Sequence, residues 1–287
     1  MKDILQNKVA VITGGSRGLG YAIAEAYARA GAKVVIASRT QPAVDKAVKK
    51  LQENGAQAEG LACDVSDLQQ VEALAEFAVR KFGQLDIWVN NAGLSAPYGP
   101  TAHIPSAEFL NVIDTNITGT YNGSVVAMRY FAAQKSGKLI NLLGRGDGGS
   151  IPLQNAYSSS KVWVRNFTKT LAKEYKHSGV DVFGFNPGLV KTEMLSSVHA
   201  VSGYEDKMNP LRFVAMLWGN AADVPAEKAL WLASSATDGK NGLLVTVLTT
   251  WFMLSRLIAL PFGWLSKQPN ELMELNITSV ESVISGD

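Results

Sequence analysis

Cysteine is almost absent from this chain of 287 residues, because Cys63 is the only one. A single cysteine cannot form an intrachain disulfide and offers no cysteine-based metal site. The three histidines, His103, His177 and His199, are scattered without the spacing of metal ligands. We therefore predict that no metal is bound, and the cysteine content fits a reducing compartment, the cytoplasm.

A strong charge of one sign is also lacking. The formal net charge is +2, and lysines and arginines form no run. Nucleic-acid binding relies on clustered cations that neutralise phosphates, so the composition does not support a nucleic-acid partner. Residues 1–8 lack a long apolar segment, and we expect no secretory signal there.

Short apolar runs alternate with amphipathic segments along most of the chain, which is 47% hydrophobic. Strands are expected over residues 8–13, 33–37, 57–63, 85–90, 138–143, 181–185 and 243–248. Helices are expected over residues 21–30, 43–54, 67–82, 106–134, 157–171, 211–218 and 224–234. This alternation predicts an α/β fold, a doubly wound Rossmann-type parallel sheet of about seven strands with helices on both faces.

A glycine-rich turn joins the first expected strand to the first expected helix. Its pattern is Gly14-x-x-x-Gly18-x-Gly20. Glycines allow the backbone to approach a pyrophosphate closely, and the start of the helix presents free N–H groups to it. The strand–turn–helix context therefore predicts a dinucleotide site.

The second expected strand ends without an acidic residue. A site that prefers NAD usually has a carboxylate there to hold the ribose 2′-hydroxyl, whereas this chain has Ser38-Arg39-Thr40. Arg39, together with Arg17 of the glycine turn, can pair with a 2′-phosphate. We therefore predict NADP rather than NAD; the alternative is that both arginines are solvated surface charges.

Tyr157 and Lys161 are four residues apart and lie on one face of the expected helix. A nearby ammonium favours the phenolate and lowers a tyrosine pKa from its ordinary value of about 10. Such a tyrosine exchanges a proton with a substrate oxygen near neutral pH. Taken alone, the pair is a weak signal, because a partly buried helical tyrosine beside a solvated lysine gives the same pattern.

In their order and spacing, these motifs resemble the short-chain dehydrogenase/reductase family from about Lys8 to Leu248. The matching residues are Thr13-Gly14-x-x-x-Gly18-x-Gly20, Asp64, Asn90-Asn91-Ala92-Gly93, Asn116, Tyr157-x-x-x-Lys161, and Pro187-Gly188 with Thr192. The resemblance implies an enzyme that transfers hydride between NADP(H) and a carbonyl or alcohol substrate. It also implies a homodimer or homotetramer.

The resemblance gives each matching residue an expected role. Tyr157 is the expected general acid/base, Lys161 is expected to hold the nicotinamide ribose, and Asn116 is expected to hold a proton-relaying water. Thr192 is expected to touch the nicotinamide carboxamide. The residues expected to bind the cofactor are Gly14, Ser16, Arg17, Gly18, Leu19, Gly20, Ser38, Arg39, Asp64, Val65, Asn91, Ala92, Gly93, Tyr157, Lys161, Pro187, Gly188 and Thr192.

One departure from the family pattern lies at the end of the fifth expected strand. The family has a catalytic serine there, and this chain has Gly144. Ser150, in the same loop, is a candidate replacement. A non-catalytic NADP-binding sensor or scaffold is therefore an alternative function.

The C-terminal part is the second departure. Residues 1–250 are expected to form the dinucleotide-binding and catalytic domain, with a lid over about 195–222. Residues 251–287 form an extension whose apolar segment, 251–265, is shorter than the roughly 20 residues of a membrane span. We expect this segment to pack on the domain or at a subunit contact. Attachment to a membrane surface, with a lipid-like substrate, is the alternative.

Overall fold

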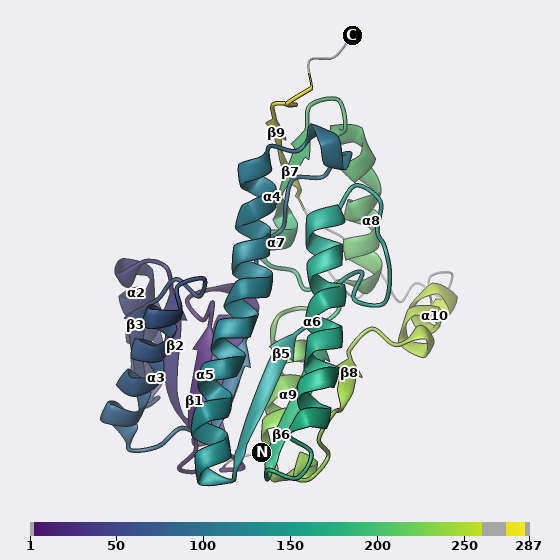
Figure 1. Cartoon of the computed structure of the whole chain (residues 1–287). Coiled ribbons are helices and arrows are strands. Elements are labelled where there is room, and N and C mark those ends of the chain that lie inside the picture. Colours follow the sequence, from purple (N-terminus) through teal and green to yellow (C-terminus); the bar gives the residue numbers. More distant parts are fainter. Residues whose placement is uncertain (1–2, 260–273, 285–287) are drawn as a thin grey trace.

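Seven strands form one central sheet in the order β3-β2-β1-β4-β5-β6-β8 (Figure 1). The computed structural model describes residues 3–259 and 274–284. The strands are β1 (Val9–Thr13), β2 (Lys33–Ser38), β3 (Ala58–Ala62), β4 (Ile87–Asn90), β5 (Gly137–Leu142), β6 (Val180–Asn186) and β8 (Leu244–Thr246). All neighbouring strands in this sheet are parallel. The predicted doubly wound parallel sheet is confirmed.

Both faces of the sheet are covered, which explains its continuous apolar runs. Successive side chains of a strand point to opposite faces, so Ala10 and Ile12 of β1 enter one buried cluster and Val11 enters the other. On the first face lie α1, α2 and α9, and on the second lie α3, α5 and α6. The helices are α1 (Gly18–Arg29), α2 (Gln41–Glu53), α3 (Leu68–Phe82), α4 (Ser106–Ile113), α5 (Gly119–Gln134), α6 (Asn155–Glu174), α7 (Glu193–Ser196), α8 (Asn209–Trp218), α9 (Asp223–Ala233) and α10 (Thr250–Ala259).

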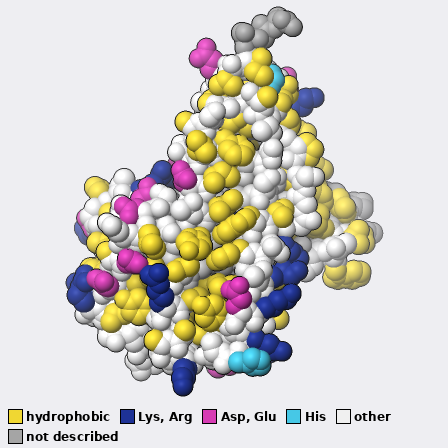
Figure 2. Space-filling model, in the orientation of Figure 1, with side chains coloured by type: hydrophobic (Ala, Val, Ile, Leu, Met, Phe, Trp, Pro, Cys, Tyr) yellow, Lys and Arg dark blue, Asp and Glu magenta, His cyan; other side chains and the backbone are white. Residues whose placement is uncertain are grey.

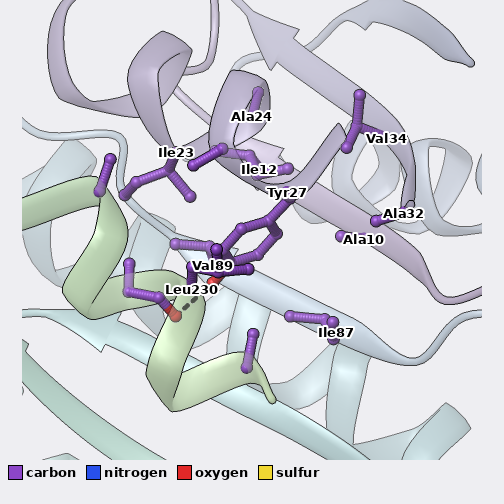
Figure 3. Close-up of a cluster of buried hydrophobic side chains, with 14 of the residues drawn as sticks. Ala10, Ile12, Ile23, Ala24, Tyr27, Ala32, Val34, Ile87, Val89 and Leu230 are labelled. Atoms are coloured by element: carbon purple, nitrogen blue, oxygen red, sulfur yellow. Dashed lines mark hydrogen bonds between the residues drawn. The ribbon is translucent and has the colours of Figure 1, made fainter. Parts of the chain in front are cut away.

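Figure 3 shows how the first cluster accommodates a polar atom. Tyr27 of α1 is fully buried, and its hydroxyl donates a 3.0 Å hydrogen bond to the carbonyl of Ala229 in α9. Burial raises the pKa of Tyr27. The bond satisfies the hydroxyl and connects two helices that are about 200 residues apart in sequence.

The predicted helix over 106–134 has the expected extent but is not uniform. A π-helical turn, η2 (Asp114–Thr118), separates α4 from α5. Asn116 lies in this turn and is fully buried. Such turns are rare insertions in α-helices and occur frequently at functional sites.

A small lobe extends from the carboxyl edge of the sheet (Figure 1). Its strand β7 (Ser197–Val201) pairs in parallel with β9 (Asn276–Val280). Val198, Ala200, Leu211 and Leu275 form its buried core. The sequence pattern predicted a lid over 195–222 but neither of these strands, because each is short and gains its pairing only from the other.

Helix α10 lies beside α8 and presents apolar side chains outward. Trp218 Nε1 donates a 3.4 Å hydrogen bond to the carbonyl of Met253, whereas Trp251 is 78% exposed and Ile258 is 63% exposed. Residues 260–265 of the predicted apolar segment lie outside the described residues. Among the residues described, no helix has both the length and the apolar character needed to cross a bilayer.

Candidate active site

The turn between β1 and α1 requires glycine at several positions. Gly14 has a φ of +64°, and a Cβ there would lie 2.9 Å from the Cα of Ala92. A Cβ at Gly20 would overlap the carbonyl of Gly14. Gly18 has a φ of +56° and faces the side chain of Thr192. The predicted cradle is therefore shaped by backbone that other residues cannot adopt without strain.

Thr13, at the end of β1, and Asn91, directly after the neighbouring strand β4, brace this turn. Asn91 Nδ2 donates to the carbonyls of Thr13 and Gly14 at 2.9 and 3.1 Å. Thr13 Oγ1 accepts from the backbone N–H groups of Asn91 and Ala92, both at 3.1 Å. The sequence motif included Thr13, but its bracing contacts became visible only in the structure.

The end of β2 also carries residues expected to bind the cofactor. The Ser38 hydroxyl is buried and has no hydrogen-bond partner within the described part of the chain. Arg39 follows it and is exposed. Arg17 pairs with Glu193 at 2.5 Å, both side chains being largely exposed. Arg39 is thus open to an added phosphate, whereas Arg17 would have to leave a carboxylate.

Asp64 and Val65 follow β3 at the same edge of the sheet. Asp64 Oδ1 accepts hydrogen bonds from the backbone N–H and the hydroxyl of Ser66 at 2.9 and 2.7 Å. Val65 is buried, and its carbonyl accepts from Asn122 Nδ2 at 2.9 Å. These bonds order the loop in which contact with the adenine was expected.

Two segments after β6 complete the cofactor side of the site. Gly188, which follows Pro187, has a φ of +73°, and its N–H donates to Asn186 Oδ1 at 3.0 Å. Four residues later, Thr192 lies over the glycine turn, since a Cβ at Gly18 would be 3.4 Å from its methyl group. The structure therefore brings Gly18 and Thr192 together, and the contact of Thr192 with the nicotinamide carboxamide stays a prediction.

Tyr157 and Lys161 lie side by side on α6. Lys161 Nζ is 5.6 Å from the centroid of the Tyr157 ring and donates a 3.0 Å hydrogen bond to the carbonyl of Leu142 at the end of β5. Lys161 is only 5% exposed. Burial lowers the pKa of Lys161 to about 8, against an opposing effect of the Asp147 carboxylate.

The expected lowering of the Tyr157 pKa is wrong for this structure. Burial raises the pKa of Tyr157 above its ordinary value, and Tyr98 and Asp147 add to the rise. The guanidinium of Arg145 acts in the opposite direction. Desolvation of the phenolate outweighs the nearby cation, and this balance depends on tertiary burial.

Gly144 provides the space in which the Tyr157 hydroxyl lies. A Cβ at Gly144 would overlap that hydroxyl and would be 3.4 Å from Cε of Lys161. Ser150, the candidate replacement for the missing serine, is exposed. The position of the usual serine is therefore adjacent to the reacting groups and is filled by the tyrosine itself.

Asn116 uses its side chain to hold the loop after β4. Its Oδ1 accepts from the N–H of Leu94 at 2.8 Å, and its Nδ2 donates to the carbonyl of Leu94 and to Ser160 Oγ, both at 3.0 Å. Ser160 precedes Lys161 on α6. Asn116 thus connects the π-helical turn to the Tyr157 helix, and the water relay expected of it stays a prediction.

Three residues near Tyr157 were not predicted from the sequence. Arg145 and Asp147 come from the loop after β5, and Tyr98 comes from the loop after β4. The charge of Arg145 lowers the pKa of Tyr98 against the larger rise caused by burial. Charged residues in a glycine-rich loop beside the expected catalytic helix were the one available signal.

Among the described residues, no group of three or more potential metal ligands occurs.

Two relatives align with about two thirds of this chain. An (S)-acetoin-forming diacetyl reductase of Staphylococcus epidermidis is 39% identical over 189 residues, which cover 66% of this chain and 73% of that protein. A chloroplastic protein of Arabidopsis thaliana, named as a probable chlorophyll(ide) b reductase, is 34% identical over 206 residues. That match covers 65% of this chain and 42% of the relative, so the chain spans less than half of the plant protein.

Solved structures match a larger share of the chain. The 3-ketoacyl-(acyl-carrier-protein) reductase of Brucella melitensis, complexed with NADH, has a TM-score of 0.75 and 29% identity, with 85% of this chain and 97% of that chain covered. A variant of actinorhodin polyketide ketoreductase with NADPH has a TM-score of 0.76 and 26% identity, with 86% and 97% covered.

The protein-family model for short chain dehydrogenases matches residues 8–202, which is more than half of the chain. The matched range begins just before β1 and includes the glycine turn, Tyr157 and Lys161. Since the sequence match and the fold agree over the same elements, this chain belongs to the short-chain dehydrogenase family.

Proposed function

We propose that this protein is an oxidoreductase that transfers hydride between NADP(H) and a carbonyl or alcohol substrate. The observation that carries the proposal is the placement of Tyr157 against the buried Lys161 at the carboxyl edge of a parallel sheet. Open α/β sheets bind their ligands at this edge. The assignment to the short-chain dehydrogenase family supports the same class of reaction.

The residues present fit a nicotinamide dinucleotide. At the start of α1, Arg17 makes no capping hydrogen bond with its side chain, which leaves the first backbone N–H groups to a pyrophosphate. The turn before it admits no Cβ at Gly14 or Gly20 without a clash. The buried hydroxyl of Ser38 lacks a partner among the described residues and would gain one from a ribose. When bound, the nicotinamide supplies or accepts the hydride.

We infer a preference for NADP(H) from the cation that follows β2. Arg39 is exposed next to Ser38, and within the described residues it forms no ion pair. A guanidinium pairs with a phosphate through two parallel hydrogen bonds, so it favours the dinucleotide that carries the 2′-phosphate. The related structures contain NADH in one case and NADPH in the other, so they do not indicate a preference for this chain. The inference of NADP(H) therefore rests on Arg39.

In this proposal, Tyr157 donates a proton to the substrate oxygen during reduction and takes it back during oxidation. The buried ammonium of Lys161 stabilises the phenolate that forms, because it lies beside the ring in a site of low polarity. Asn116 positions Lys161 through Ser160 and keeps the loop after β4 in place.

The reaction is tested by Tyr157→Phe with a panel of ketones, aldehydes and quinones. We expect turnover to fall at least a thousandfold, which is in the range of a lost general acid, while NADPH binding stays within about threefold of the parent protein. Full activity of the variant rules out the acid/base role. A parent protein that binds NADPH but reduces no member of the panel would favour the sensor or scaffold function instead.

The cofactor preference is tested by titrating NADPH and NADH into the parent, Arg39→Ala and Arg80→Ala. Arg80 is an exposed arginine on α3 that pairs only with its own helix and serves as the charge control. We expect Arg39→Ala to weaken NADPH binding about tenfold or more, the order of one charged hydrogen bond, and to leave NADH unchanged. Equal affinity of the parent for both cofactors would contradict the proposal.

We also infer that the chain forms a homo-oligomer through the face made by α4, α5 and α6. Figure 2 shows hydrophobic side chains gathered on this side of the molecule. Leu110, Tyr121 and Val162 are exposed there by 55%, 47% and 41%. Tyr121 also contacts Phe167 across α5 and α6, with ring centroids 6.3 Å apart. A second copy of this chain would cover these side chains.

A further inference from the structure

We propose that Arg145 binds an anionic group of the substrate, so that the preferred substrate is a carbonyl compound with a carboxylate or phosphate close to its carbonyl. This inference rests on the proposed function, because it assigns a substrate class to the same site. It depends on where Arg145 lies, on the absence of an ion pair for its charge among the described residues, and on its exposure beside a loop that the lid holds in place.

Arg145 is held next to the reacting hydroxyl by its backbone. The preceding residue, Gly144, lies so close to Tyr157 that a Cβ would overlap the hydroxyl. The Gly144 carbonyl accepts hydrogen bonds from Asn186 Nδ2 and from the N–H of Asp147, both at 3.1 Å. These bonds fix the backbone before and after Arg145. The Arg145 side chain therefore begins one residue after the glycine that contacts the Tyr157 hydroxyl.

Arg145 carries a charge that nothing neutralises within the described residues. It takes part in no ion pair there, whereas Asp147, two residues later, pairs with Arg165 at 3.0 Å. Its charge acts on the hydroxyl of Tyr98, which is a neutral group. A guanidinium without a carboxylate partner keeps N–H donors for a ligand.

The charge of Arg145 influences both tyrosines near the site. It lowers the pKa of Tyr98 and of Tyr157 against the larger rise caused by burial. Tyr98 belongs to the loop after β4, and Arg145 belongs to the loop after β5. The cation of one loop therefore acts on the tyrosine of the other loop and on Tyr157.

The lid holds Tyr98 in place. The N–H of Tyr98 donates to the carbonyl of His199 in β7, and the carbonyl of Tyr98 accepts from the N–H of Val201, both at 2.8 Å. The Tyr98 ring packs against the core of the lobe that contains β7. Arg145 itself is exposed, so an anionic ligand can reach its guanidinium from solvent beside this ordered loop.

The chemistry of the side chain favours a carboxylate or phosphate over other ligands. Its planar fork of donors matches the two oxygens of a carboxylate or of a phosphate. The missing side chain at Gly144 leaves the approach to Tyr157 without a competing hydroxyl. The anionic group is unchanged by the reaction, so its only function is to orient the carbonyl.

The test compares matched anionic and neutral carbonyl compounds. Pyruvate is paired with methyl pyruvate, acetoacetate with methyl acetoacetate, and dihydroxyacetone phosphate with dihydroxyacetone. In the parent protein we expect kcat/KM for the anionic member of at least one pair to exceed that of the neutral member tenfold or more. The carboxylate and phosphate pairs then show which anion is preferred.

The variants Arg145→Gln and Arg145→Lys identify the residue responsible. We expect Arg145→Gln to lose the anionic preference, with a tenfold to hundredfold higher KM for the anionic member alone. The effect of the lost charge on the pKa of Tyr157 is common to both members, so kcat should change by the same factor for both. Arg145→Lys should retain part of the preference. Arg80→Gln removes another exposed positive charge, on α3, and should change neither value.

Three results overturn the inference. Arg145→Gln can lower kcat/KM of anionic and neutral members equally, which would make Arg145 a donor to the carbonyl oxygen. The parent can prefer neutral substrates, or the variant can behave like the parent. If the parent turns over none of these compounds, calorimetric binding of acetoacetate to the NADPH-loaded parent and to Arg145→Gln decides, and equal affinities reject an anion site. Failure of the proposed function shows instead as absent turnover of every carbonyl.

Discussion

At Gly144, a single missing side chain decides where the tyrosine hydroxyl lies. The ordinary Cβ position is taken by the end of Tyr157, so this glycine and this tyrosine conformation require each other. Gly144 is buried at the end of β5 and cannot move freely, since its carbonyl accepts two hydrogen bonds. A side chain at this position must therefore displace the tyrosine.

We expect Gly144→Ser to reduce kcat at least tenfold on any substrate that the parent reduces. The added Cβ and hydroxyl push the Tyr157 hydroxyl out of its place, and a misplacement of about 1 Å costs up to a hundredfold in rate. Steady-state kinetics and NADPH binding measure the effect. Gly148→Ser is the matched control, because Gly148 lies in the same loop and a Cβ there would have no other atom within 4 Å. A faster Gly144→Ser enzyme would show that the parent site has lost an essential hydroxyl.

Lys161, to which we assign a role in the reaction, lowers the stability of the folded protein at neutral pH through its burial. Burial lowers its pKa to about 8 from the model-compound value of 10.5. Between these two pH values the folded protein binds fewer protons than the unfolded chain, so stability rises with pH in that window. The cost of the buried ammonium is fully present below about pH 8 and disappears as the pH approaches 10.5.

We expect Lys161→Met to abolish turnover yet raise the free energy of unfolding at pH 7. The gain should be up to about 3 kcal/mol, the value of the pKa difference, less what is lost with the hydrogen bond to Leu142. Urea denaturation at pH 7, 8.5 and 10 measures it, with Lys169→Met on the exposed side of α6 as control. The gain should shrink as the pH rises; a gain that is the same at every pH would mean that packing, not charge, is responsible.

At the scale of elements, the lid depends on a strand from the far end of the chain. Strand β9 pairs with β7 along its full length, and Ser202 N–H donates to the carbonyl of Val280 at 2.9 Å. The other edge of β7 contacts the loop after β4 at Tyr98. The extension and the lid are therefore joined, and β9 holds β7 against the loop that borders the site.

We expect Ile277→Asn to loosen the lid without unfolding the sheet. Ile277 packs on the small core of the lobe, whereas its neighbour Thr278 is exposed on the opposite side of β9. The variant should be cut faster by protease within residues 195–222, and its KM should rise severalfold with cofactor affinity unchanged. Thr278→Asn is the control. A variant with parent-like proteolysis and KM would show that β9 does not restrain the lid.

At the scale of the whole molecule, two surfaces of the described residues expose apolar side chains in the single chain. One is the face of α4, α5 and α6 with Tyr121 and Val162, and the other is the outer side of α10 with Trp251. The first is a broad surface on three rigid helices next to the sheet, and Trp163 and Phe167 stack on it with centroids 4.7 Å apart. Rigid, aromatic surfaces of this kind are typical of the centre of a protein interface.

We expect the parent to be a dimer or tetramer. The double variant Tyr121→Glu/Val162→Glu should form a smaller species. Light scattering after size-exclusion chromatography measures both masses. Two buried carboxylates would oppose association strongly. Phe213→Glu, at a residue 51% exposed on α8, is the control and should leave the mass unchanged. A monomeric parent would refute the oligomer, and its recovery with membranes would favour α10 as a surface attachment.

Patterns that involve a few neighbouring residues were predictable from the sequence. The glycine turn was predictable because positive φ angles and close backbone contacts at Gly14 and Gly18 exclude other residues. The alternation of strands and helices was predictable because each element shows its own periodicity. The pairing of Tyr157 with Lys161 was predictable because residues four apart share a helix face.

Features that depend on contacts between distant residues were decided only by the tertiary structure. The sequence could not show that Glu193 pairs with Arg17 across 176 residues, or that β9 pairs with β7. It placed Tyr157 beside a cation but not in a buried position, so the direction of its pKa shift was wrong. Local conformation follows from neighbours along the chain, whereas desolvation and charge balance depend on every element that surrounds a group, and those elements meet only in the folded protein.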